Sequence, residues 1–95
     1  MTPETTTSDA ALQHLRDQVS ETDRAIVDLV NRRLDLVRRI WRRKEELGLE
    51  VVDPQREAWL LDHLRGANNG PLSDEGLHEL LTAVLDLTKR ELAGR

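Results

Sequence analysis

The feature that most constrains this chain is a series of residues spaced three and four apart over about 40 positions. This spacing places the series on one face of a helix, and predicts one long amphipathic helix from about Asp9 to near Gly48. In order, the seam is formed by Leu12, Leu15, Val19, Thr22, Ile26, Leu29, Arg33, Val37, Ile40, Lys44 and Leu47.

A helix of this length is too long for a compact domain of this size. At ~1.5 Å per residue it extends roughly 55–60 Å, whereas a compact chain of 95 residues has a radius of gyration of about 12–13 Å. The helix would overhang its own domain and leave apolar seam without cover. We therefore expect an intertwined helical homodimer, in which a second copy covers the seam.

The rest of the chain predicts two further helices. Asp53 and Pro54 are typical of an N-cap followed by proline at the first helical position, and that helix runs to about Arg65. After a Gly- and Asn-rich loop at 66–71, Ser73 begins a third helix that ends near Gly94. The two apolar stripes are Trp59, Leu60, Leu61 and Leu64, and then Leu77, Leu80, Leu81, Val84, Leu85, Thr88 and Leu92.

These elements predict an all-α fold with a long, a short and a long helix in one domain, 9–95. Residues 1–8 are polar and aperiodic, and we expect a disordered tail there. The absence of cysteine excludes disulfides and a cysteine nucleophile. No apolar run is long enough for a membrane span or a signal peptide, so a cytoplasmic location is expected, with no membrane partner.

Nucleic acid is not an expected partner either. The net charge is −4, and although the stretch from Arg32 to Lys44 is dense in arginine, two of its cations belong to the seam. The remaining arginines are expected to form a solvated face that attracts a dianion.

Arg33 and Lys44 occupy seam positions where the period requires apolar residues. They are 11 residues apart, which corresponds to about 20° around the helix and roughly 16 Å along it, so they share one face. Burying a cation without a partner costs several kcal/mol, so an anionic group should meet them. Two interpretations stay open, an ion pair that fixes helix register and a site for an anionic ligand. Arg16 lies about 100° from Arg33 around the helix, so it cannot serve the same pocket from the same copy, and the helical phase leaves open that it reaches the pocket of an antiparallel partner.

With these cations, the ordered set of polar residues resembles the AroQ-class, all-helical chorismate mutases, including their short actinobacterial subclass. The resemblance covers roughly residues 12–92 and keeps its spacing without a gap from Arg16 to Glu57. The residues that carry it are Leu15-Arg16, Asp23, Arg32-Arg33, Lys44 and Asp53-Pro54-Gln55-Arg56-Glu57.

The resemblance implies a shikimate-pathway isomerase of aromatic amino acid biosynthesis. The reaction is the Claisen rearrangement of chorismate to prephenate, which needs no cofactor, metal or nucleophile. It needs the substrate held folded, with cations where charge develops on the ether oxygen. By resemblance, Lys44 donates to that oxygen and Arg33 grips a carboxylate, together with Arg16 from the partner subunit. The resemblance also makes Glu57 a catalytic residue beside Lys44 and Arg33, and places it with Asp53 near the ring hydroxyl. Arg56 supports binding, and Thr88 lies near a carboxylate.

One position departs from the family pattern. Leu92 stands four residues after Thr88, where the family often has a glutamine that donates to the ether oxygen. Three explanations stay open. In the first, the alignment is shifted by one residue and Glu91 takes that role. In the second, which we favour, the enzyme is slow until DAHP synthase activates it. In the third, the substrate is a relative of chorismate, either 4-amino-4-deoxychorismate for a mutase or isochorismate for a pyruvate lyase. On the second explanation, Leu92→Gln raises kcat. A non-catalytic dimeric interaction module is the alternative outside enzymes.

Overall fold

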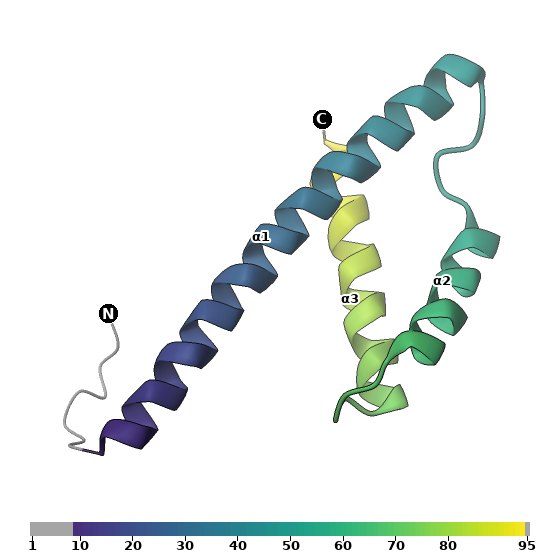
Figure 1. Ribbon diagram of the computed structural model, residues 1–95. Helices are drawn as coiled ribbons and strands as arrows, with labels where there is room; N and C mark the ends of the chain where they lie inside the picture. Colours follow the sequence, from purple (N-terminus) through teal and green to yellow (C-terminus); the bar gives the residue numbers. More distant parts are fainter. Residues whose placement is uncertain (1–8, 95) are drawn as a thin grey trace. The chain divides into compact units, whose positions relative to one another are not determined.

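The computed structural model describes residues 9–94, and every regular element in this range is an α-helix (Figure 1). The helices are α1 (Ala10–Leu47), α2 (Pro54–Ala67) and α3 (Asp74–Ala93). This order confirms the predicted all-α, long-short-long architecture. The predicted tail, 1–8, lies outside the described residues.

The end of α1 is set by a glycine. Gly48 adopts φ +70°, a left-handed conformation that costs glycine little because it has no Cβ. The turn places the Leu49 N–H on the Lys44 carbonyl at 2.8 Å and the Gly48 N–H on the Glu45 carbonyl at 3.2 Å. These two bonds form a Schellman motif, which satisfies carbonyls that the helix end would otherwise leave unpaired. The predicted end near Gly48 is confirmed.

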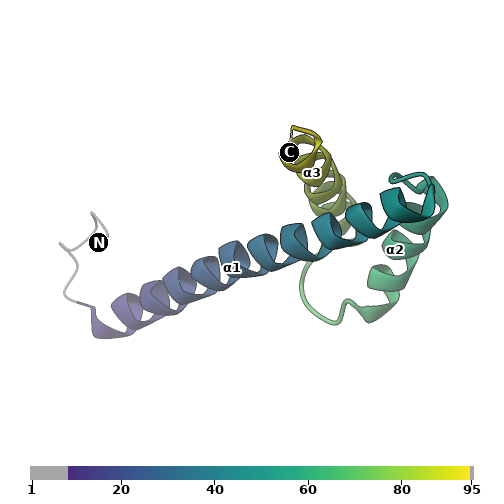
Figure 2. The same cartoon turned by 90° about the horizontal axis from the view of Figure 1, so that it is seen from above.

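The other two helices begin at side-chain caps. The Asp53 carboxylate accepts the Arg56 N–H at 3.1 Å, and Pro54 opens α2, as predicted. The Ser73 hydroxyl accepts the Gly76 N–H at 3.0 Å at the start of α3. The segment 48–53 leads from the end of α1 into α2 (Figures 1 and 2).

The chain divides into two compact units at Arg33. The first contains α1 up to Arg32, and its seam residues are solvent-exposed in the single chain; Leu29, for example, is 61% exposed. The second contains the remainder of α1, from Arg33, with α2 and α3. The exposed seam of the first unit is the surface that the sequence predicted a second copy would cover.

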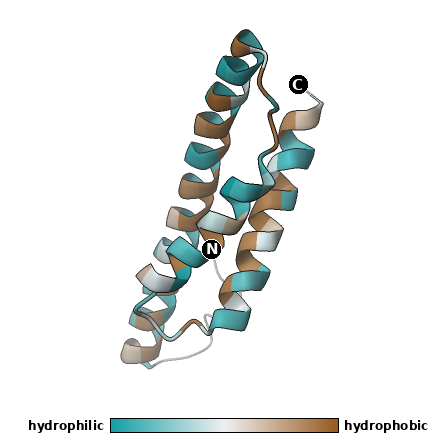
Figure 3. Ribbon diagram, turned by 90° about the vertical axis from the view of Figure 1, so that its right-hand side faces the viewer, coloured by the Kyte–Doolittle hydropathy of each residue, from teal (hydrophilic) through white to brown (hydrophobic). Residues whose placement is uncertain are grey.

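The core of the second unit lies along α3, where Leu77, Leu81, Thr88 and Leu92 are buried. Helix α2 packs against α3, and each helix alternates apolar and polar bands, as amphipathic helices do (Figure 3).

Two members of the predicted apolar stripes, Leu80 and Trp59, are exposed in the single chain. Trp59 is 47% exposed, and its ring lies against Arg56 and His63 of its own helix, so the indole packs along the surface of α2.

The arginine-rich part of α1 forms a solvated face, as expected. Arg38 and Arg39 both pair with Asp35 at 2.8 Å, and Arg43 pairs with Glu46 at 3.1 Å, all within one helix turn. Such exposed pairs contribute little to stability. None of the helices in 9–94 is long and apolar enough to cross a membrane.

Candidate active site

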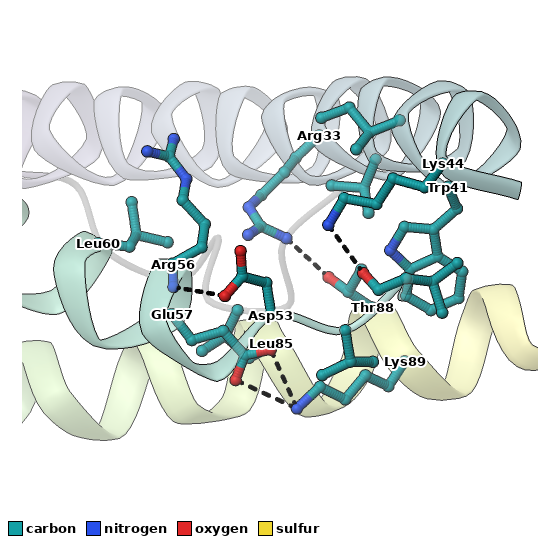
Figure 4. Close-up of a pocket in the computed structure, with 14 residues that line it drawn as sticks. Arg33, Trp41, Lys44, Asp53, Arg56, Glu57, Leu60, Leu85, Thr88 and Lys89 are labelled. Atoms are coloured by element: carbon teal, nitrogen blue, oxygen red, sulfur yellow. Dashed lines mark hydrogen bonds and ion pairs between the residues drawn. The ribbon is translucent and has the colours of Figure 1, made fainter. Parts of the chain in front are cut away.

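A cavity of about 280 Å³ lies within the second unit, between the last turns of α1, the 48–53 segment, α2 and α3 (Figure 4). Six of the seven residues predicted for the site line it; Arg16 does not. The lining consists of Arg33, Val37, Ile40, Trp41, Lys44, Val51, Val52, Asp53, Arg56, Glu57, Leu60, Leu85, Thr88 and Lys89.

Arg33 reaches from α1 to the buried hydroxyl of Thr88 on α3. The Arg33 Nη1 donates to Thr88 Oγ1 at 2.8 Å, and that hydroxyl donates its own hydrogen to the Val84 carbonyl at 2.7 Å. The back-bond to the preceding helical turn is common for threonine. Because its one hydrogen is already committed, the hydroxyl is oriented with a lone pair toward Arg33. Thr88 therefore holds the guanidinium in place.

Lys44 lies at the other end of the cavity. Its Nζ donates to the Val51 carbonyl at 3.2 Å, and Figure 4 shows the ammonium at the cavity, on the same side as the Arg33 guanidinium. An ammonium has three donors, so two remain for a ligand. The structure therefore confirms that Arg33 and Lys44 share one face and bring their charges to one cavity.

Asp53 and Arg56 come from the first turn of α2. Since Asp53 is the N-cap, the same contact that starts the helix directs its carboxylate into the cavity wall. The Arg56 guanidinium lies 4.1 Å from the centre of the Trp59 ring, and Trp59 stacks on His63 at 4.6 Å. The cation–π contact gives a reason for a cation in a first helical turn, where the helix dipole disfavours it.

Glu57 forms an ion pair that the sequence did not predict. Lys89 of α3 places its Nζ 3.3 Å from Oε1 and 3.2 Å from Oε2 of Glu57, and both side chains line the cavity (Figure 4). The ammonium thus contacts both carboxylate oxygens. Lys89 directly follows Thr88 and lies outside the apolar stripe, so the sequence pattern alone indicates a solvent-exposed lysine.

The charges of the cavity are unbalanced. Four cationic and two anionic side chains line it, and Lys89 and Glu57 neutralise each other. Within residues 9–94, no ion pair involves Arg33, Lys44 or Arg56. The register-fixing ion pair does not form in this part of the chain, so the geometry favours the anion-site interpretation.

Three residues named from the sequence lie outside the lining. Arg16 belongs to the first unit. Leu92 is 8% exposed and belongs to the core of α3, while Glu91 is exposed, and neither borders the cavity. Burial of Leu92 argues against the expectation that a glutamine at this position raises kcat, because the amide would lie in the core. That expectation stays a prediction for a kcat measurement.

Comparison with known proteins identifies the family of the chain. The model of the family described as chorismate mutase type II matches residues 15–91. The chain belongs to the chorismate mutase type II family. This match spans all three helices and the whole cavity, and it confirms the resemblance found in the sequence.

Two of the three similar proteins described next are named chorismate mutase, and the third is named T-protein. A solved structure of chorismate mutase (form I) from Thermus thermophilus superposes with a TM-score of 0.79 at 36% identity, covering 82% of this chain and 98% of that one. The chorismate mutase of Methanocaldococcus jannaschii is 32% identical over 54 residues, which are 57% of this chain. The T-protein of Enterobacter agglomerans is 42% identical over 52 residues, 55% of this chain. The chain spans between 14% and 54% of the length of these two curated relatives.

Proposed function

We propose that this chain is a chorismate mutase, which converts chorismate to prephenate by an intramolecular Claisen rearrangement without a cofactor. The observation that carries the proposal is the cavity in which Arg33, Lys44 and Arg56 meet with no acidic partner among residues 9–94. Arg33 and Lys44 are half-buried and have no ion pair among these residues, so an anionic ligand would compensate their charges. Chorismate brings two carboxylates.

The arginines would bind those carboxylates. A guanidinium offers a planar fork that matches a carboxylate, and Thr88 already fixes the orientation of the Arg33 fork. Arg56 would support binding from α2, and Arg16 would be supplied by the second copy of a homodimer. The exposed apolar seam of α1 supports that dimer, since a partner would cover it.

Lys44 would stabilise the transition state. During the rearrangement the carbon–oxygen bond breaks while a carbon–carbon bond forms, and negative charge develops on the ether oxygen. A compact ammonium suits a single oxygen, and Lys44 is held by Val51 with two donors unused. Glu57 and Asp53, on the α2 side of the cavity, would meet the ring hydroxyl.

The proposal includes activation by DAHP synthase and a cytoplasmic location, and both rest on the sequence alone. The observation behind a slow isolated enzyme is Leu92, which stands where the family often has a glutamine. Measuring turnover with and without DAHP synthase distinguishes an activated enzyme from one that is efficient alone.

The decisive experiment follows chorismate consumption and identifies the product. Prephenate supports the proposal, whereas pyruvate release would indicate a lyase, and no consumption of chorismate or its relatives would leave a non-catalytic module. Lys44→Met should lower kcat by about 100-fold or more, the usual loss when a preorganised donor is removed. Arg42→Met is the matched control, because Arg42 is an exposed cation of α1 outside the lining and its loss should leave turnover unchanged.

A further inference from the structure

Among residues 9–94, Glu57 and Lys89 form the one ion pair in the cavity wall, and the proposed mechanism uses only its acidic member. Its atoms are 3.2–3.3 Å apart, and neither side chain is fully exposed, at 28% for Glu57 and 39% for Lys89. The pair joins α2 to α3 across 32 residues of sequence, so it depends on the packing of the two helices. A role for Lys89 follows from what it does to Glu57.

Together the two side chains present an acceptor and a donor at one place. A carboxylate only accepts hydrogen bonds and an ammonium only donates them. A hydroxyl group does both, so it can donate to Glu57 and accept from Lys89 at the same time. A substrate ammonium at the same position can only donate, and it would meet the positive charge of Lys89 in a partly buried site where like charges repel strongly.

We infer that Lys89 is a specificity-determining residue, which makes Glu57 a site for a neutral hydroxyl and against an ammonium group. This inference rests on the proposed function, in which Glu57 meets the ring hydroxyl of chorismate. The amine analogue, 4-amino-4-deoxychorismate, is selected against by Lys89.

The test compares kcat/KM for chorismate and for 4-amino-4-deoxychorismate in the same preparations. The wild-type chain should prefer chorismate. Lys89→Gln keeps a hydrogen-bond donor but removes the charge, and should shift the ratio about tenfold toward the amine, which corresponds to about 1.4 kcal/mol. Lys89→Arg keeps the charge and should stay within about threefold of the wild-type ratio. Arg90→Gln removes a charge from an exposed neighbour outside the lining, and should leave the ratio unchanged.

Each outcome bears on a different claim. If the wild-type chain consumed neither compound, the proposed function would fall and the inference with it. If it consumed chorismate but accepted the amine equally well, or if the ratio were the same in Lys89→Gln, only the role of Lys89 would be refuted. Circular dichroism checks that the variants stay helical, and Lys89→Met repeats the test if the glutamine variant does not fold. The wild-type preference is measured independently of either variant.

Discussion

Removing the Thr88 hydroxyl should reduce activity far more than stability. Thr88→Val keeps the shape of the side chain and deletes the hydroxyl oxygen of a residue that is only 5% exposed. Two contacts are lost, the 2.8 Å bond from Arg33 and the 2.7 Å bond to Val84. The Val84 carbonyl retains its helical backbone partner, and the new methyl group is well placed in a core of leucines.

The magnitudes separate the two effects. A hydrogen bond to a charged group contributes about 1.5–3 kcal/mol, but Arg33 is only partly buried and can hydrate when released, so the free energy of unfolding should change by about 1 kcal/mol or less. The guanidinium loses its anchor on α3 and with it the orientation required by a bidentate carboxylate contact. We expect kcat/KM to fall about tenfold, or about 1.4 kcal/mol of transition-state binding.

The assay is steady-state turnover of chorismate beside thermal unfolding followed by circular dichroism. Thr88→Ser retains the hydroxyl and should keep most of the activity, while Thr82→Val changes an exposed threonine of the same helix and should change neither quantity. In a double-mutant cycle, Thr88→Val should add little to Arg33→Met, because the two residues act through one contact. Full activity in Thr88→Val, or an equal loss in Thr88→Ser, would refute a positioning role.

Two further predictions concern stability. Gly48→Ala should lower the free energy of unfolding by about 1–2 kcal/mol, because φ is +70° and no atom lies near the added Cβ, so the cost is that of the left-handed backbone. Gly66→Ala, inside α2 and with equal space, should raise it by about 0.5–1 kcal/mol. Equal effects of the two variants in urea unfolding would contradict this account. Leu92→Gln should lower the free energy of unfolding by about 2–4 kcal/mol without raising kcat, because it buries an amide in the α3 core. A faster and equally stable variant would restore the donor interpretation of that position.

The helix ends could be predicted because their causes are local. A glycine at Gly48, an aspartate before proline at 53–54 and a serine at Ser73 each satisfy backbone groups within four residues of themselves. Arg33 and Lys44 could be identified for a related reason, because both are cations at positions that the apolar period of a single helix assigns to apolar residues. Their position on one face follows from helical phase, whereas the cavity that they line also requires α2 and α3.

Lys89 and Trp59 could not be placed from the sequence because their contacts depend on which faces meet. A lysine after Thr88 indicates a solvated residue unless α2 presents Glu57 to it, and that depends on the packing of α2 against α3. Trp59 belongs to an apolar stripe by period, yet its ring lies beside Arg56 and His63 instead. The contribution of Arg16 depends on a second chain and stays a prediction.

The devices that end and begin the helices also build the candidate site. The Lys44 carbonyl accepts the Leu49 N–H of the Schellman turn, while the Lys44 ammonium donates to Val51, so both ends of the residue are tied to the 48–53 segment. Asp53, at the end of that segment, caps α2 and lines the cavity with the same carboxylate. A change in the turn at Gly48 would therefore move the proposed catalytic ammonium as well as the helix end. For this reason Gly48→Ala should lower kcat in addition to stability, whereas Gly66→Ala, on α2 outside the cavity lining, should alter stability alone.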